Sequence, residues 1–316
     1  MNIVFLDKGT LGEDIDVSIF SSLGDFTAYP STPKDLVCKR ISCADIVITN
    51  KVKLTCELLK QAKSLKLICV TATGYDNIDL EYAKKAGIAV CNVVGYSTES
   101  VALVTVSLVL SLCCHIKEYT RYCSEGEYTN SGIQNHLSPV FYELSGKVWG
   151  IYGFGNIGKR VASIAEALGC KVIVCKRNKV EDYENVSLQE LFEKSDIITV
   201  HTPLTQETKN SINEQVLNKA KHGLTLVNAA RGAIIDDNAL YCAITNGKVA
   251  NFATDVYSVE PLAKDSPLYS LRKNDNVLFT PHMAWGAYES RKRLVQEIYK
   301  NILAFKQGTL RNRVDI

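Results

Sequence analysis

Short apolar runs alternate with longer amphipathic segments from the first residues of the chain. The runs "IVFL", "DIVIT" and "LKLICV" have the length and the branched side chains of buried strands, whereas "TCELLKQAKS" and "NIDLEYAKKAG" have helical periodicity. Parallel strands can be joined only by long crossover connections, which are usually helices. The alternation therefore predicts a parallel sheet that is covered by helices on both faces.

The same alternation begins again near Lys147. A second set of strand-like runs follows from there, again separated by helical segments: "KVWGIYG", "KVIVC", "DIITVH", "GLTLVNAA", "VANFATDV" and "NVLFTP". A chain of 316 residues is long enough for two domains, each with its own core. We therefore expect an α/β protein made of two Rossmann-like, doubly wound parallel-sheet domains.

The segment from Thr98 to Tyr122 separates the two sets of strands and is mostly apolar, without Gly or Pro. Its length and its lack of turn residues favour one buried linking helix. The alternative is a stack of strands, since Val is abundant. A further periodic segment, "YESRKRLVQEIYKNILAF", follows the last strand and is predicted to return to the first domain. The expected domains are residues 1–98 with 285–316, and residues 99–284.

Composition argues against several kinds of partner. The 36 basic and 34 acidic residues are mixed along the chain and leave a net charge of +2, which gives no field that would attract nucleic acid or anionic lipid. The 11 cysteines are scattered and contain no C-x-x-C pair, so no metal site is indicated. No run approaches the roughly 18 apolar residues of a membrane span, and "MNIVFLDKG" has no basic leader. We expect a cytoplasmic protein with no metal, nucleic-acid or membrane partner.

The stretch "GFGNIG", from Gly153 to Gly158, matches the G-x-G-x-x-G pattern of a dinucleotide-binding loop. It follows the strand-like "KVWGIY" and precedes the helical "KRVASIAEALG", which is the context that this pattern requires. The glycines would form a tight turn, admit a pyrophosphate to the backbone and seat the helix on the sheet, and the helix N-terminus would supply free N–H groups. The alternative is a glycine-rich turn that binds nothing.

Six motifs occur in a characteristic order: "ATGYDNID", "GFGNIG", "HTPLTQET", "VNAARGAIID", "ATDVYSVEP" and "TPHMAW". Together they resemble the D-isomer-specific 2-hydroxyacid dehydrogenase family over nearly the whole chain, and within it the bacterial glycerate dehydrogenase (hydroxypyruvate reductase) group. The resemblance implies that residues 99–284 form an NAD(P)-binding Rossmann domain and that the other domain binds substrate. It also implies an active-site cleft between the domains and a homodimer with the linking helix at its interface.

Reduction of a 2-keto acid requires a cation for the carboxylate, an acid that protonates the oxygen, and a group that keeps the acid charged. Arg231 follows a strand-like run, and its planar guanidinium suits a carboxylate with a keto oxygen beside it. His282 follows another run and is expected to donate the proton. Glu260 resembles the family's acid that pairs with this His, and a nearby carboxylate favours imidazolium. Without the resemblance, a surface ion pair for Arg231 and a solvated turn for Glu260 compete with these roles.

The same resemblance implies further contacts. The backbone amides of Thr73 and Gly74 would bind the substrate carboxylate opposite Arg231. Thr202 and Pro203 would line the adenosine side. Around the nicotinamide, Ala229 would approach the ring and Asp255 would meet the carboxamide. The implied coenzyme contacts are Gly153, Phe154, Gly155, Asn156, Ile157, Gly158, Lys176, Arg177, Asn178, His201, Thr202, Pro203, Thr208, Ala229, Ala230, Arg231, Asp255, His282 and Thr105.

Two places depart from the family's pattern. Leu103 and Val104 stand where the group commonly has a polar pair, which removes polar contacts near the nicotinamide or across the dimer. The second departure is Lys176, followed by Arg177 and Asn178, at the strand end where NAD-binding relatives commonly have an Asp for the adenosine ribose. These cations would favour the 2′-phosphate of NADP by about 1–3 kcal/mol. The alternative is that they are solvated cations at a strand end, with NAD(H) as the coenzyme.

The leading hypothesis is NAD(P)H-dependent reduction of a small 2-keto acid, of the hydroxypyruvate or glyoxylate type, to the D-2-hydroxy acid. One alternative is a bulkier branched or aromatic 2-keto acid, which the apolar Leu103 and Val104 would permit. Another is a non-catalytic protein that senses a dinucleotide. The joint presence of Arg231, Glu260 and His282 argues against the non-catalytic alternative.

Overall fold

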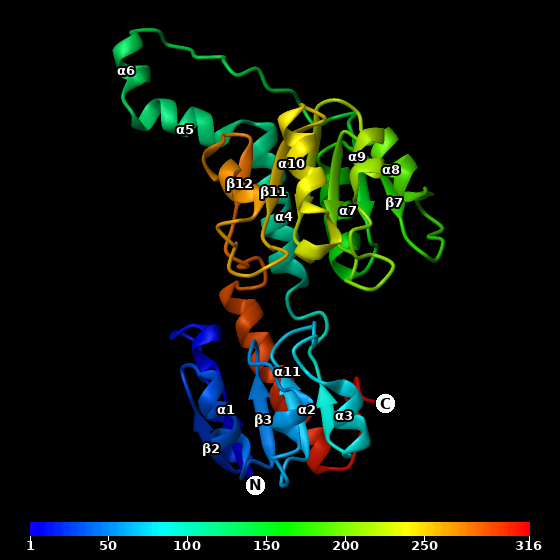
Figure 1. Ribbon diagram of the computed structural model, residues 1–316. Coiled ribbons are helices and arrows are strands. Elements are labelled where there is room, and N and C mark those ends of the chain that lie inside the picture. Colours follow the sequence, from blue (N-terminus) through cyan, green and yellow to red (C-terminus); the bar gives the residue numbers. More distant parts are fainter. The chain divides into compact units, whose positions relative to one another are not determined.

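The computed structural model describes all residues from 1 to 316, and the chain separates into two compact units (Figure 1). The first unit comprises Met1–Ser97 and Gly286–Ile316, and the second comprises Thr98–Trp285. These bounds lie within one residue of the domain bounds expected from the sequence. Each unit contains its own parallel sheet with helices between its strands, so the expected α/β fold with two parallel sheets is confirmed.

The first unit is built on a five-stranded parallel sheet with the strand order β2-β1-β3-β4-β5. Its strands are β1 (Asn2–Phe5), β2 (Asp25–Ala28), β3 (Ile46–Thr49), β4 (Leu67–Val70) and β5 (Ala89–Cys91). The central strands β3 and β4 are buried along their whole length, as expected for strands covered on both faces. Strand β2 was not predicted, because this largely exposed edge strand, "DFTA", contains no apolar run.

Three helices connect the strands of the first unit: α1 (Lys34–Ile41), α2 (Cys56–Leu59) and α3 (Leu80–Lys85). The unit also contains the C-terminal helix α11 (Tyr288–Lys306). Helix α2 covers only the first part of the segment "TCELLKQAKS". Helix α11 lies in the first unit although the chain reaches it last, and it buries one apolar stripe that includes Leu294, Ile298 and Ile302.

The second unit is built on a seven-stranded parallel sheet with the order β12-β11-β10-β9-β6-β7-β8. Its strands are β6 (Val148–Tyr152), β7 (Lys171–Cys175), β8 (Glu184–Asn185), β9 (Ile197–Val200), β10 (Leu224–Asn228), β11 (Val249–Thr254) and β12 (Val277–Phe279). All were expected except the two-residue edge strand β8. The strand order reverses at β6, which lies between β9 and β7, and ligands of such sheets bind beyond the carboxyl ends of the strands at this point.

Two apolar clusters cover the two faces of this sheet. One joins Trp149 of the sheet with residues of α4 (Thr98–Cys113) and α7 (Asn156–Ala167). The other joins Tyr152 with residues of α8 (Leu188–Lys194), α9 (Glu214–Lys219) and α10 (Asp237–Thr245). Alternate residues of β6 therefore point to opposite faces, and both faces are covered.

The prediction of one helix from Thr98 to Tyr122 was wrong. Helix α4 ends at Cys113, His115 adopts a left-handed conformation with φ of 51°, and α5 (Ile116–Ser124) starts in a direction 66° away. The break falls where the sequence becomes polar, and α5 buries no residue. No single helix is long and apolar enough to span a membrane, although α4 and α5 pass that test as a bent pair.

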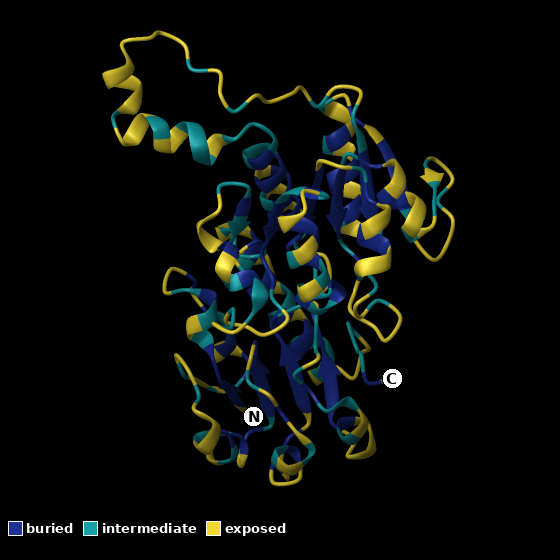
Figure 2. Ribbon diagram, turned by 45° about the horizontal axis from the view of Figure 1, so that its top comes forward, coloured by how far each residue is buried: buried dark blue, intermediate teal, exposed yellow.

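An extended arm, residues 114–146, follows α4 and contains α5, α6 (Glu127–Ser131) and an irregular return segment. Figures 1 and 2 show the arm projecting away from the rest of the second unit, with most of its residues exposed. Contacts within the arm include a stacked pair of rings, Tyr122 and His136, whose centroids lie 3.9 Å apart. The arm therefore has local order, and its residue Leu144 packs against an apolar cluster of the second unit.

Candidate active site

The carboxyl ends of three neighbouring strands bring the proposed catalytic residues to one edge of the second sheet. Arg231 follows β10, Glu260 follows β11 and His282 follows β12, and these strands lie in the order β12-β11-β10. Residues that follow parallel strands meet at one edge of the sheet. The topology thus explains how side chains from three distant motifs share one location.

His282 and Glu260 form a hydrogen-bonded pair. The Nδ1 atom of His282 lies 2.7 Å from Oε2 of Glu260, and the two side chains are 25% and 34% exposed. The second oxygen of Glu260, Oε1, accepts a hydrogen bond of 3.2 Å from the backbone N–H of Tyr257. A ring that gives its Nδ1 proton to a carboxylate presents Nε2 as its remaining polar atom.

The backbone at His282 adopts a left-handed conformation with φ of 55°, which is rare for a residue with a Cβ atom. Its N–H donates to the carbonyl oxygen of Thr280 at 3.1 Å, and its own carbonyl oxygen accepts from the indole N–H of Trp285 at 3.0 Å. Such a conformation persists only where the surrounding structure imposes it. The neighbouring contacts therefore define the direction of the imidazole.

Asp255 supplies most of the support for this turn. Its carboxylate accepts hydrogen bonds from the backbone N–H groups of Met283 and Ala284, both at 2.8 Å, and from the hydroxyl of Thr280 at 2.6 Å. The residue is only 1% exposed. A contact of this carboxylate with the nicotinamide carboxamide, which the resemblance implies, would compete with these three donors and stays a prediction.

Arg231 lies in extended backbone between β10 and a short 3-10 turn, Gly232–Ile234. Its Nη1 donates to the carbonyl oxygen of Ala230 at 2.8 Å, and no carboxylate lies within ion-pair distance of its guanidinium. The chain after it passes close to the 257–260 loop: a Cβ atom on Gly232 would lie 2.0 Å from the carbonyl carbon of Tyr257. Gly232 thus allows the Arg231 segment to pack against the loop that contains Glu260.

The phosphate loop lies at the carboxyl end of β6, where the strand order reverses. Gly153 has φ of 94°, and a Cβ atom there would lie 2.4 Å from the backbone nitrogen of Thr202. A Cβ on Gly158 would lie 2.3 Å from the carbonyl oxygen of Gly153, whereas Gly155 faces open space. Helix α7 begins at Asn156 without a side-chain cap, so its first N–H groups are available to an anion. This geometry fits the pyrophosphate of a dinucleotide.

The predicted adenosine side is formed by the ends of β7 and β9. Lys176, Arg177 and Asn178 follow β7 and are exposed, and neither cation forms an ion pair. His201 follows β9; both of its ring nitrogens are buried without a hydrogen-bond partner, and burial lowers its pKa to about 3. The ring is therefore neutral at physiological pH.

Comparison with known proteins decides the family. Residues 106–284 match the family model described as "D-isomer specific 2-hydroxyacid dehydrogenase, NAD binding domain". The hydroxypyruvate reductase of Blautia hydrogenotrophica is 36% identical over 100% of both chains. The glycerate dehydrogenase of Methylorubrum extorquens is 35% identical over 99% of this chain and 98% of its own.

The chain belongs to the D-isomer-specific 2-hydroxyacid dehydrogenase family. Its structure is similar to that of a D-lactate dehydrogenase from Aquifex aeolicus in complex with NAD and lactic acid, with a TM-score of 0.88, 31% identity, and coverage of 100% of this chain and 99% of the other. This dehydrogenase is accordingly an oxidoreductase that uses a nicotinamide dinucleotide, and the matched region contains the phosphate loop, Arg231, Glu260 and His282.

Of the other predicted coenzyme residues of the dehydrogenase, those that follow β9 and β10 lie at the same sheet edge, whereas Thr105 lies within α4. The loop after β9 is closed by a hydrogen bond of 2.7 Å from the Thr208 hydroxyl to the Pro203 carbonyl oxygen. Ala229 and Ala230 follow β10 and are half-buried. Thr105, on α4, is fully buried, and its hydroxyl has no partner. The coenzyme contacts of these residues stay predictions.

The two residues that depart from the family's pattern lie on α4. Leu103 is 63% exposed, whereas Val104 packs against the apolar cluster between α4 and the sheet. Neither side chain can form a hydrogen bond.

In the first unit of the dehydrogenase, the loop after β4 contains Thr73 and Gly74. The Thr73 hydroxyl donates to the Val93 carbonyl oxygen at 2.8 Å, which fixes the loop against the chain beyond β5. Sequence reasoning missed Asp7, a buried carboxylate after β1 that accepts hydrogen bonds from three successive N–H groups, Asn50, Lys51 and Val52. Burial raises the pKa of Asp7. The only signal in the sequence was its place directly after "IVFL".

Proposed function

We propose that this dehydrogenase reduces a small 2-keto acid of the hydroxypyruvate or glyoxylate type to the D-2-hydroxy acid. The observation that carries the proposal is the hydrogen-bonded His282–Glu260 pair beside Arg231 at the ends of three neighbouring strands. Similarity to proteins named hydroxypyruvate reductase and glycerate dehydrogenase supports the choice of substrate.

The residues divide the chemistry among them. Arg231 binds the substrate carboxylate and the keto oxygen through its planar fork of N–H groups. His282, held through Nδ1 by Glu260, gives a proton from Nε2 to the oxygen on which negative charge develops. Glu260 orients the imidazole and places its carboxylate beside the positive charge of the protonated ring. The reduced coenzyme, when bound at the phosphate loop, supplies the hydride.

NADPH is the proposed electron donor. Lys176 and Arg177 are exposed, form no ion pair and follow the strand next to the phosphate loop. A 2′-phosphate adds roughly −1.5 to −2 charges at pH 7, which two such cations and the Asn178 amide would bind. We expect a preference of about 1–3 kcal/mol, equivalent to roughly 5- to 150-fold in kcat/KM.

A homodimer is the proposed assembly, with the arm of residues 114–146 as part of the interface. The arm exposes large apolar side chains, namely Ile116, Tyr128, Ile133, Leu137, Val140, Phe141 and Tyr142. Exposed apolar surface of this extent marks a contact site. Light scattering should give the mass of a dimer for the wild type, and a monomer after Leu137→Asp with Val140→Asp. A wild-type monomer would refute the assembly.

The function is tested by turnover with a panel of 2-keto acids. Hydroxypyruvate, glyoxylate, pyruvate, a branched 2-keto acid and phenylpyruvate would each be assayed with NADPH and with NADH, and the product analysed for handedness. We expect hydroxypyruvate and glyoxylate to give the highest kcat/KM. Tight coenzyme binding without turnover of any acid would instead identify a dinucleotide sensor.

A further inference from the structure

Tyr257 contacts each of the loops that carry the proposed catalytic residues. It lies three residues before Glu260, and its ring packs edge-on against Phe279 of β12 with centroids 5.8 Å apart. The hydroxyl at the end of this ring donates a hydrogen bond of 2.9 Å to the carbonyl oxygen of Thr280. The side chain thus bridges the loop after β11 and the turn after β12.

The carbonyl oxygen of Thr280 is the acceptor on which the His282 turn closes. It accepts the N–H of His282 at 3.1 Å as well as the hydroxyl of Tyr257. A carbonyl oxygen has two lone pairs, so the two donors satisfy it fully. The Tyr257 hydroxyl therefore fixes the carbonyl that holds His282 in its left-handed conformation.

The backbone of Tyr257 makes the other two contacts. Its N–H donates to Oε1 of Glu260, whose Oε2 faces Nδ1 of His282. Its carbonyl group packs against Gly232, directly after Arg231, where a Cβ atom would meet the Tyr257 carbonyl carbon at 2.0 Å. One residue therefore adjoins the segments of Arg231, Glu260 and His282.

We propose that Tyr257 is a positioning residue for the proton donor, acting through its hydroxyl on the Thr280–His282 turn and through its N–H on Glu260. The inference rests on the proposed function, because it assumes that His282 protonates the substrate. Tyr257 itself does not touch the reacting atoms in this arrangement. Its loss would slow protonation and leave the phosphate loop and the residues after β7, at the other half of the sheet, unchanged.

The hydroxyl has the right protonation state for this role. Burial, followed by the nearby carboxylates of Asp255 and Glu260, raises the pKa of Tyr257 to about 12. The group therefore remains a donor throughout the neutral pH range. No other donor is within hydrogen-bond distance of the Thr280 carbonyl oxygen besides the His282 N–H.

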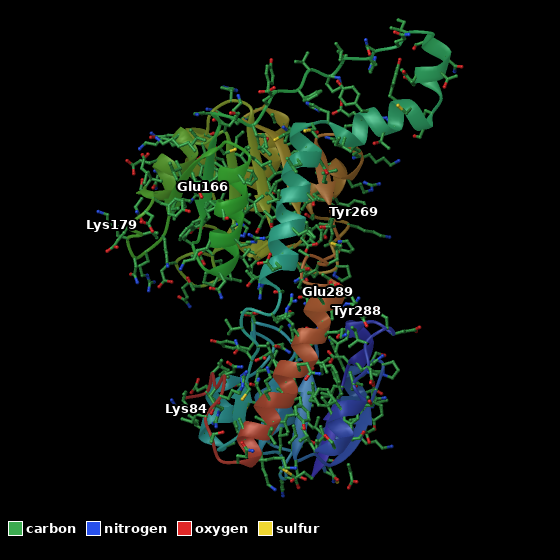
Figure 3. All side chains as sticks on the ribbon, turned by 180° about the vertical axis from the view of Figure 1, so that it is seen from behind. Lys84, Glu166, Lys179, Tyr269, Tyr288 and Glu289 are labelled. Carbon is green, nitrogen blue, oxygen red and sulfur yellow. The ribbon has the colours of Figure 1, made fainter.

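The test is Tyr257→Phe, which keeps the ring and removes only the hydroxyl. We expect kcat with hydroxypyruvate to fall by about 3- to 10-fold, the equivalent of one ordinary hydrogen bond, while the KM for the coenzyme stays within about 2-fold. Tyr269→Phe is the control, because Tyr269 lies in the same unit (Figure 3) and its hydroxyl makes no hydrogen bond. It should change neither constant.

A second readout does not depend on activity. In protein labelled with ¹⁵N-histidine, the Nδ1–H proton of the His282–Glu260 pair would be assigned by its loss in His282→Asn, and its exchange with water should be faster in Tyr257→Phe. If Tyr257→Phe changed neither kcat nor the exchange rate, the proposal would be overturned. A rise in the coenzyme KM of this variant as large as its fall in kcat would also overturn it. If the wild type turned over no 2-keto acid, the proposed function would fail, and the exchange rate would still decide the role of Tyr257.

Discussion

Oε2 of Glu260 lies 2.7 Å from Nδ1 of His282, and Oε1 of the same carboxylate accepts the N–H of Tyr257. Both oxygens are thus engaged, and the imidazole is held with Nε2 as its remaining polar atom. Glu260→Gln keeps the shape of the side chain and removes its charge. We expect kcat to fall by about 10- to 100-fold, because a neutral amide stabilises imidazolium poorly. Steady-state kinetics would check this, and an unchanged kcat would contradict the role of the charge.

Coenzyme choice depends on the two cations after β7. Lys176→Asp with Arg177→Ala should move the ratio of kcat/KM for NADPH over NADH towards NADH by at least about 10-fold, since an acid there repels the 2′-phosphate and can bind the ribose. Lys179→Ala is the matched control, because Lys179 is exposed on the same loop (Figure 3) and should leave the ratio within about 2-fold. A wild type that already prefers NADH would show that Lys176 and Arg177 are only solvated.

Two glycines of the second unit should respond differently to the same change. Gly232→Ala places a methyl group 2.0 Å from the Tyr257 carbonyl carbon and should lower the free energy of unfolding by about 1–3 kcal/mol or more. Gly155→Ala meets nothing within 4 Å and should leave stability unchanged, but its methyl group would occupy the space that the pyrophosphate approaches. Urea unfolding and the coenzyme KM would separate the two effects. Equal stabilities of both variants would contradict the close approach at Gly232.

Acid should destabilise the second unit through His201. Burial lowers the pKa of His201 to about 3, whereas an unfolded His titrates near 6.5, so the unfolded chain binds the proton first. Stability from this group is present above pH 6.5 and is lost as the pH falls towards 3, by up to about 5 kcal/mol. Denaturant unfolding of wild type and His201→Asn between pH 7 and 4 checks the prediction. The difference in free energy of unfolding between the wild type and His201→Asn should narrow or reverse at low pH. A difference that stays constant from pH 7 to 4 would refute the prediction.

Much of the fold could be predicted because buried parallel strands are short apolar runs. The runs "IVFL", "DIVIT" and "KVIVC" lie on β1, β3 and β7. The phosphate loop could be predicted as well, because its glycines lie close together in the sequence and are required by the turn itself. Gly153 has φ of 94°, and Gly158 packs against the carbonyl oxygen of Gly153. By contrast, the break at His115 was missed although the sequence becomes polar there, because the segment contains no Gly or Pro that would mark the end of a helix.

The chemical groups of the candidate site could be predicted from the sequence, but the contacts that hold them in position could not. Arg231, Glu260 and His282 belong to motifs, and strand order explains how they meet. The sequence gives no sign that Asp255 turns its carboxylate towards Met283 and Ala284, because the partners are 28 and 29 residues apart. Contacts of this kind exist only in the folded chain.

The most direct test is turnover of hydroxypyruvate with NADPH by the wild type and by His282→Asn. Asn tolerates the left-handed backbone at this position better than Ala does, so the turn should survive the change. We predict that the wild type forms D-glycerate and that kcat of the variant is lower by about 10²- to 10⁴-fold, with coenzyme affinity nearly unchanged. A variant that retains wild-type turnover would contradict the assignment of His282 as the proton donor.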